Sequence, residues 1–204
     1  MTENNRRLGI LISGRGSNLQ SIIDAVAEDR LVAVIAVVVS NEPGAAGLQR
    51  ARLAGIETLV IDHRTFPSRS AYDTALVEAL RGYNVGLVCL AGFMRLLGKG
   101  FVDAFSGRIL NIHPSLLPAF PGLHGQQQAL EYGVRVTGAT VHIVTPDLDA
   151  GPIVMQASVA IGEDDTVQSL SERILVEEHR IYPEAIARLL SGRWRIEGRR
   201  FVKI

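Results

Sequence analysis

The run Leu31-Val32-Ala33-Val34-Ile35-Ala36-Val37-Val38-Val39 decides the fold class of this 204-residue chain. It contains no polar residue and is rich in valine, which favours β-strands. A strand without a polar face is typical of a parallel sheet that helices cover on both sides. At nine residues the run is also too short to cross a bilayer. The sequence therefore predicts an α/β protein with a buried strand over 31–39.

Strands and amphipathic helices alternate on both sides of this run. A strand predicted over 8–13 precedes a helix over 17–27, in which four apolar residues recur at helical spacing: Leu19, Ile22, Ile23 and Val26. After the run we expect a helix that ends at Leu53, a strand over 58–61, a helix over 70–81 and a strand over 85–91. Such units in series predict a three-layer, doubly wound, mostly parallel open sheet with right-handed crossovers.

The second half of the chain continues with longer elements. We expect a short strand before Asn111, a helix over 122–132, strands over 137–144 and 153–160, a helix over 165–190, and a terminal strand or hairpin over 194–204. The inner stripe of the last helix comprises Val167, Leu170, Ile174 and Ile181. Glu178 falls on the same stripe, where a carboxylate is costly unless it is paired or bound. A ligand contact and a structural salt bridge both explain it.

Composition limits the classes of partner. Lys plus Arg equals Asp plus Glu at 21 each, which argues against a general nucleic-acid surface. Cys89 is the single cysteine, so no intramolecular disulfide is available and a reducing compartment is expected. The polar start, residues 1–7, lacks the apolar core of a signal peptide. We predict a cytoplasmic protein without membrane or nucleic-acid partners, and no spacing of His, Cys or Asp indicates a metal.

A glycine-bearing turn, Ser13-Gly14-Arg15-Gly16-Ser17-Asn18, connects the first predicted strand to its helix. Backbone N–H groups at a helix start favour an anion, and glycine lets the backbone approach it closely. Leu19 stands where a dinucleotide fingerprint has its third glycine, and the Lys-Ser/Thr pair of a Walker loop is missing. A phosphate monoester therefore fits better than NAD or ATP. The alternative is a plain strand-to-helix turn.

Asn111-Ile112-His113-Pro114 follows the apolar residues Ile109 and Leu110. Side chains alternate along a strand, so Asn111 and His113 point the same way. An amide donor beside an imidazole that titrates near neutral pH suits an oxyanion on a carbonyl carbon. The alternative is a polar corner in which the Asn111 side chain caps the turn and His113 is satisfied by hydrogen bonds to the backbone.

Two further stretches lie where parallel strands are expected to end, the edge at which ligands bind in such sheets. Phe93 and Met94 could form the floor of a slot for an aromatic ligand, and Arg95 could meet a carboxylate. Core packing and a solvated charge explain them equally well. Asp147 and Asp149 lie in a turn with Pro and Gly, where local hydrogen bonding is the usual role of Asp.

Several motifs, taken in order, resemble the phosphoribosylglycinamide formyltransferase family over nearly the whole chain. They are Leu11–Gln20, Leu90–Arg95, Asn111–Pro118, Pro121–His124, Leu148–Pro152 and Glu178–Pro183. The run Gly125-Gln126-Gln127 departs from the family, where bulkier or more basic residues are expected. The resemblance implies a single formyltransferase domain over 1–204, with a phosphate-binding half over about 1–100 and a folate and catalytic half over about 101–204.

The resemblance implies formyl transfer from 10-formyltetrahydrofolate, a co-substrate, to the amine of glycinamide ribonucleotide in purine synthesis. Asn111, His113 and Asp149 match the catalytic group, in which Asp149 would keep His113 protonated beside the oxyanion. Thr140 matches a position whose hydroxyl orders water. The expected ribonucleotide contacts are Gly16, Ser17, Asn18, Pro114 and Glu178. The expected folate contacts are Arg69, Phe93, Met94, Arg95, Leu96, Leu97 and Asp147.

Related activities remain as alternatives. A 10-formyltetrahydrofolate hydrolase shares the folate site and the Asn, His and Asp group, but it has no need of a phosphate loop. A methionyl-tRNA formyltransferase would add a tRNA-binding domain, for which 204 residues leave no room. A nucleotide-binding module without chemistry would not need the catalytic group. We expect a monomer or a homodimer.

Overall fold

The computed structural model describes residues 6–204. The chain divides into two compact units, of which the first ends at Leu110 and the second is Asn111–Ile204. The functional halves expected from the sequence stay a prediction, because this division concerns compactness and not ligands.

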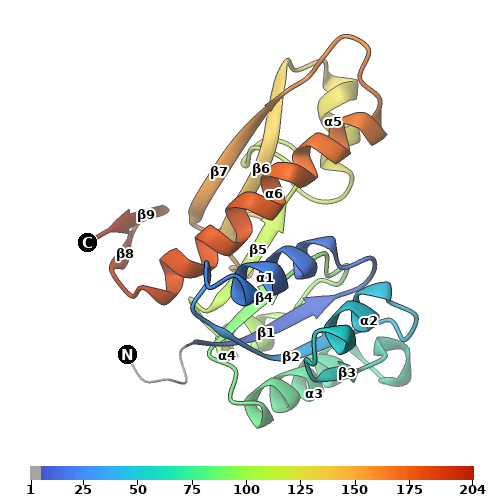
Figure 1. The fold of residues 1–204 in the computed structure, drawn as a ribbon, viewed down its shortest axis with the longest axis vertical. Coiled ribbons are helices and arrows are strands. Elements are labelled where there is room, and N and C mark those ends of the chain that lie inside the picture. Colours follow the sequence, from blue (N-terminus) through green and yellow to red (C-terminus); the bar gives the residue numbers. More distant parts are fainter. Residues whose placement is uncertain (1–5) are drawn as a thin grey trace. The chain divides into compact units, whose positions relative to one another are not determined.

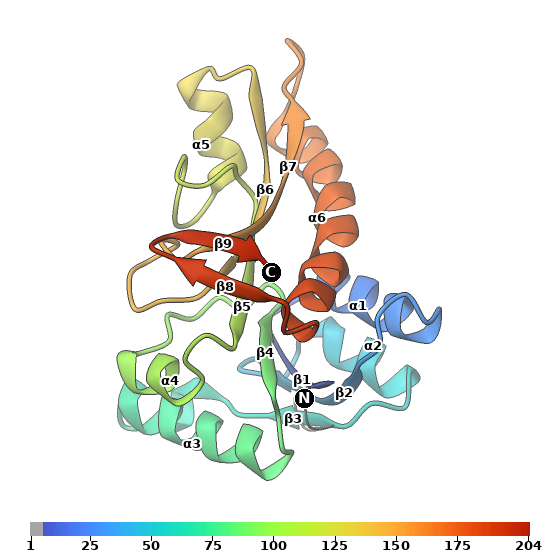
Figure 2. The same ribbon diagram turned by 90° about the vertical axis from the view of Figure 1, so that its left-hand side faces the viewer.

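The first unit is a parallel sheet with helices on both faces. Its elements are β1 (Arg7–Ile12), α1 (Ser17–Ala27), β2 (Val34–Ser40), α2 (Ala46–Leu53), β3 (Thr58–Val60), the 3-10 turn η2 (His63–Thr65), α3 (Arg69–Gly82), β4 (Leu87–Leu90) and α4 (Lys99–Ala104). The strands lie in the order β3-β2-β1-β4, and all three of these pairs are parallel. In Figures 1 and 2, α1 and α2 cover one face and α3 and α4 the other. This is the doubly wound pattern that the alternating sequence predicts.

Strand β5 (Ile109–His113) crosses the division between the units. The second unit then contains α5 (Gly125–Tyr132), β6 (Val136–Ile143), β7 (Ile153–Ala160), α6 (Val167–Leu190), β8 (Trp194–Glu197) and β9 (Arg200–Lys203). β6 and β7 form a long antiparallel pair, and α6 packs along both strands (Figure 2). The last two strands form the predicted hairpin, in which Trp194 stacks on Phe201 at a centroid distance of 5.1 Å.

Two predicted element boundaries and one predicted buried residue are wrong. Leu31–Ala33 is not part of a strand, and β2 begins at Val34, which is 53% exposed. The helix predicted from Gly122 begins only at Gly125, because Gly122 and His124 have left-handed backbone conformations, with φ of 82° and 60°. Val167 is 44% exposed and does not belong to the inner stripe of α6.

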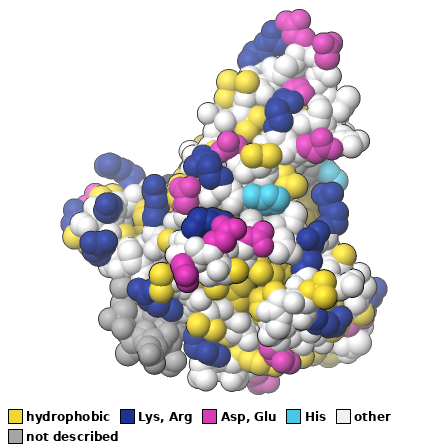
Figure 3. Space-filling model, viewed as in Figure 1, with side chains coloured by type: hydrophobic (Ala, Val, Ile, Leu, Met, Phe, Trp, Pro, Cys, Tyr) yellow, Lys and Arg dark blue, Asp and Glu magenta, His cyan; other side chains and the backbone are white. Residues whose placement is uncertain are grey.

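Basic side chains gather on the C-terminal hairpin, where Figure 3 shows them in dark blue. They are Arg193, Arg195, Arg199, Arg200 and Lys203. One of them is used inside the second unit: Nη2 of Arg199 donates to the Ala150 carbonyl at 2.7 Å. Within residues 6–204, no helix has the length and apolar character needed to span a bilayer.

Candidate active site

Strands β5 and β6 bring polar side chains within hydrogen-bond reach of one another. Nδ2 of Asn111 lies 3.2 Å from Nε2 of His142. His113 is two residues beyond Asn111 and shares its side of the strand, because side chains alternate. His113 and His142 are only 4% and 2% exposed, whereas Asn111 is half-buried. The second unit therefore holds an amide and two imidazoles together.

The carboxylate of Asp149 lies between the two imidazole rings. Oδ2 is 3.5 Å from Nδ1 of His113, and Oδ1 is 3.6 Å from Nε2 of His142. The backbone of Asp149 is left-handed, with φ of 48°, which Asp tolerates better than most residues. Its Oδ2 also accepts a hydrogen bond from the Gly122 N–H at 2.8 Å. The turn thus places the Asp149 carboxylate beside both rings. Asp149 therefore makes contacts beyond the local hydrogen bonds that its position next to Pro and Gly suggested.

Both ring nitrogens of His113 face acceptors. Nε2 lies 2.9 Å from the Phe120 carbonyl oxygen, so its N–H donates there, and Nδ1 faces Asp149. Burial nevertheless lowers the pKa of His113, and the Phe120 bond and the Asp149 charge offset only part of this effect. The expectation that Asp149 keeps the ring protonated is therefore corrected: the carboxylate acts in the expected direction, but desolvation is the larger effect.

Asp149 itself is stabilised as an anion. Burial alone would raise the pKa of this carboxyl, but the contact with His142, the Gly122 N–H and the nearby His113 bring its pKa below the ordinary value. At neutral pH the cluster therefore contains one negative charge between two rings that can accept protons. This arrangement stabilises either ring when it becomes positively charged.

His142 orients the amide of Asn111. Its Nδ1 lies 3.2 Å from the Ile143 carbonyl, so a neutral ring with its proton there leaves the Nε2 lone pair for an N–H of Asn111. A charged ring would donate from Nε2 to Asp149 instead. An amide nitrogen carries two N–H groups, so the second N–H of Asn111 remains for a ligand oxygen.

The hydroxyl of Thr140 is fully used inside the protein. It donates to the Ser115 carbonyl at 2.6 Å and accepts from the Leu117 N–H and from Nε2 of Gln156, both at 3.0 Å. A hydroxyl has one proton and two lone pairs. The resemblance led us to expect that this hydroxyl orders a water, but it has no donor or acceptor left to do so. It instead fixes the segment that follows His113.

The remaining predicted residues of the second unit differ in exposure. Glu178 lies on the inner side of α6 with 7% exposure, which confirms its predicted place on the buried stripe. Pro114 is half-buried directly after His113, and Asp147 is exposed in the turn before Asp149.

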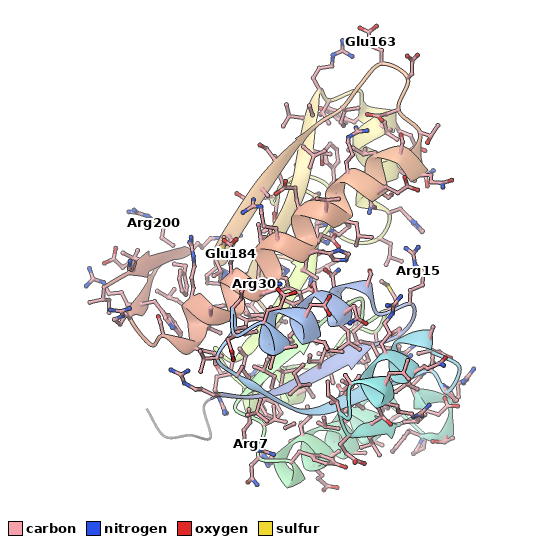
Figure 4. All side chains as sticks on the ribbon, in the orientation of Figure 1. Arg7, Arg15, Arg30, Glu163, Glu184 and Arg200 are labelled. Atoms are coloured by element: carbon pink, nitrogen blue, oxygen red, sulfur yellow. The ribbon has the colours of Figure 1, made fainter. Side chains whose placement is uncertain are left out.

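In the first unit, the glycine turn closes tightly against α2. Gly16 has a φ of 72°, and a Cβ added to it would lie 2.6 Å from the Cα of Gly47. The Gly47 N–H donates to the Gly14 carbonyl at 3.0 Å, and Nε of Arg50 donates to the Arg15 carbonyl at 3.0 Å. Figure 4 shows the Arg15 side chain pointing outward. The turn is therefore fixed by backbone contacts and leads directly into α1, where Ser17 is half-buried and Asn18 is buried.

The predicted folate residues of the first unit lie on the loop after β4 and at the start of α3. Met94 and Leu96 are 67% and 63% exposed. Arg69 and Arg95 are also exposed, and Phe93 and Leu97 are half-buried. Apolar side chains that lie exposed on a loop beside two arginines are available to a ligand with an aromatic part and a carboxylate.

Sequence reasoning missed the part that His142 plays. The sequence motifs assign no role to His142. Its position two residues from Thr140 was the available signal, because both side chains must point to the same side of β6. Among residues 6–204, no group of three or more His, Cys, Asp or Glu side chains is arranged to hold a metal ion.

An amide, two imidazoles and a carboxylate held this close together can stabilise an oxyanion and move a proton, as the site of a group-transfer enzyme requires. The sequence profile of the formyl transferase family matches residues 6–186. The chain belongs to the formyl transferase family, which confirms the resemblance seen in the sequence motifs.

Relatives and solved structures agree with this membership. The chain is 47% identical over 184 residues to phosphoribosylglycinamide formyltransferase of Escherichia coli, covering 90% of this chain and 87% of that protein. It is 48% identical over 190 residues to the trifunctional purine biosynthetic protein adenosine-3 of Bos taurus, covering 93% of this chain but only 19% of the longer relative. The crystal structure of glycinamide ribonucleotide transformylase 1 from Symbiobacterium toebii matches with a TM-score of 0.97 and 55% identity, over 100% of this chain and 96% of that one. This likeness confirms the predicted fold class.

Proposed function

We propose that this chain transfers the formyl group of 10-formyltetrahydrofolate to the primary amine of glycinamide ribonucleotide, a step of purine synthesis. The observation that carries the proposal is the cluster of Asn111, His113 and Asp149 in a chain 47% identical to a phosphoribosylglycinamide formyltransferase. Location in the cytoplasm and a monomeric or homodimeric state remain predictions from the sequence.

The proposed reaction begins when the amine nitrogen attacks the formyl carbon and forms a tetrahedral oxyanion. The second N–H of Asn111 is suited to stabilise that charge. Collapse of the intermediate then breaks the bond between the formyl carbon and N10 of the folate. One proton must move from the attacking amine to N10.

His113 and Asp149 are suited to move this proton. Burial lowers the pKa of His113 and so favours the neutral ring. Because Nε2 already donates to the Phe120 carbonyl, Nδ1 is the nitrogen that takes the proton from the amine. The Asp149 carboxylate, 3.5 Å from Nδ1, stabilises the imidazolium that forms. His113 then returns the proton to N10 as the bond to carbon breaks, so the residues end in their starting state.

Binding roles follow from the matched motifs within each unit. In the first unit, we assign Gly16, Ser17 and Asn18 to the ribonucleotide phosphate, and Arg69, Phe93, Met94, Arg95, Leu96 and Leu97 to the folate. In the second unit, we assign Pro114 and Glu178 to the ribonucleotide and Asp147 to the folate. The left-handed Gly16 at the start of α1 supports the phosphate role, because a residue without a Cβ lets an anion approach the backbone N–H groups closely.

Dependence on the amine substrate tests the proposal. Purified protein is mixed with 10-formyltetrahydrofolate, and release of tetrahydrofolate is followed with and without glycinamide ribonucleotide. We expect release only when the ribonucleotide is present, and formylated ribonucleotide in equal amount. Equal release with water alone would identify a hydrolase instead. Asn111→Ala serves as the inactive control, and Thr74→Ala, at an exposed site on α3, serves as the active one.

A further inference from the structure

Ser13 is hydrogen-bonded to the loop that follows β4, through both its backbone and its side chain. The Ser13 N–H donates to the Gly92 carbonyl at 3.1 Å, and Oγ accepts from the Met94 N–H at 2.8 Å. The next residue, Gly14, begins the glycine turn that continues to Asn18. Ser13 therefore joins two loops of the first unit that are far apart in the sequence.

A buried partner fixes the direction of the Ser13 hydroxyl. Oγ donates its proton to Oδ1 of Asn41 at 2.6 Å. A hydroxyl has only one proton, so its lone pairs are left for the Met94 N–H. Asn41 is 2% exposed, and its Nδ2 lies 3.3 Å from Oε1 of Glu42 and 3.3 Å from Nδ1 of His63. The bond between Ser13 and Met94 is therefore part of a fixed network.

The loop after β4 has a second anchor at its far end. Oδ2 of Asp73, a residue on α3 with 6% exposure, accepts from the Gly98 N–H at 2.8 Å. Asp73 belongs to α3 and anchors only the loop at Gly98, whereas Ser13 is covalently continuous with the glycine turn. Loss of the Asp73 anchor loosens one loop, and loss of the Ser13 anchor separates two.

We propose that Ser13 is a positioning residue that couples the glycine turn to the loop Gly92–Leu97, so that ligand binding at one raises affinity at the other. The inference rests on the proposed function, which assigns the ribonucleotide phosphate to the turn and folate to the loop. A phosphate bound at the already fixed turn stabilises the position of Ser13, and Ser13 in turn holds the Met94 N–H in place, so less ordering of the loop remains for the folate to complete. Such coupling must be reciprocal.

Calorimetric titrations with ligands that cannot react measure the coupling. Tetrahydrofolate, which has no formyl group, is titrated anaerobically into the protein with and without saturating glycinamide ribonucleotide. For the unmodified protein we expect the ribonucleotide to tighten tetrahydrofolate binding by about fivefold or more, the lower end of ordinary coupling between sites. Ser13→Ala should bring this ratio close to one. Ser13→Thr keeps a hydroxyl and should restore the ratio.

Variants at α3 separate coupling from general loosening. Asp73→Ala should weaken tetrahydrofolate binding but keep the ratio, and Thr74→Ala should leave both unchanged.

Asn41→Ala keeps the Ser13 hydroxyl but frees its rotation, so it should reduce the ratio partly, and it decides the matter where Ser13→Ala does not fold. A ratio near one in the unmodified protein would overturn the coupling. So would an undiminished ratio in Ser13→Ala or, where that variant does not fold, in Asn41→Ala. Turnover of the unmodified protein with both substrates then shows that only the coupling, and not the proposed function, has failed.

Discussion

The two units expose different kinds of group. In the first unit, the turn after β1 presents backbone N–H groups, and the loop after β4 presents side chains such as Met94, which is 67% exposed. In the second unit, His113 and His142 are almost completely buried around the Asp149 carboxylate. Backbone groups are altered only by changing the shape of the turn, whereas a buried cluster is altered by removing one charge. Substitutions in the first unit should therefore act mainly on KM, and those in the second mainly on kcat.

Asp149→Asn should give the largest effect. The variant keeps the side-chain shape and an acceptor for the Gly122 N–H but removes the charge that stabilises a protonated His113. Loss of general acid–base catalysis typically lowers kcat by roughly 10²–10⁴, and we expect a loss within this range with little change in either KM. Steady-state kinetics check this, with tetrahydrofolate binding as the control for folding. Near-full kcat would mean that Asp149 is only a turn residue.

Asn111→Ala should follow, because it removes the proposed oxyanion donor. Loss of one such donor typically lowers kcat by roughly 10²–10³. Residues that act in one catalytic unit are not additive, so Asn111→Ala/Asp149→Asn should lose less than the product of the two single losses. Kinetics of the four proteins measure this. A fully multiplicative loss would show that the amide and the carboxylate act independently.

Gly16→Ala tests the other side of the comparison. Its φ of 72° and the 2.6 Å approach to Gly47 strain any side chain there, at a cost of roughly 1–3 kcal/mol. We expect KM for the ribonucleotide to rise by about tenfold, with a smaller change for folate. Gly14→Ala is the matched control, because an added Cβ at Gly14 meets nothing within 4 Å. Equal rises in both KM values would point to unfolding of the unit.

The pH dependence of stability should show the smallest effect. Burial lowers the pKa of His113, so between the unfolded value near 6.5 and the lower folded value the unfolded chain binds more protons. Stability should therefore fall as pH is lowered from 7.5 to 5.5, and His113→Gln should lose less stability over this range. Urea unfolding at both pH values measures the difference. His124→Gln, at an exposed position, is the control and should follow the unmodified protein.

Elements with a complete local signal could be predicted from the sequence. The helix over 17–27 is correct at both ends, because its apolar spacing is regular and a glycine turn precedes it. Glu178 could be placed on the buried stripe of α6 for the same reason. Leu31–Ala33 could not be separated from β2, since apolar composition does not reveal where strand pairing begins.

The site could be predicted only where residues lie close in sequence. Asn111 and His113 share a strand, so their common side followed from alternation alone. The contact of His142 with Asn111 and Asp149 depends on pairing and turn geometry, which a single sequence does not specify. The pKa of His113 is set mainly by burial, which outweighs the raising effect of the Asp149 charge, so the Asp149 contact alone does not give the net direction.

The close approach of Gly16 to Gly47 restricts how this protein can be redesigned. A Cβ on Gly47 would itself lie 2.6 Å from Cδ1 of Ile12 and 3.1 Å from the Cα of Gly16. A side chain at either position requires its neighbours to move, and side chains at both would crowd each other further, so neither glycine is expected to vary in a mutant library. An attempt to redesign the turn should therefore randomise Arg15, whose side chain is exposed, and keep both glycines.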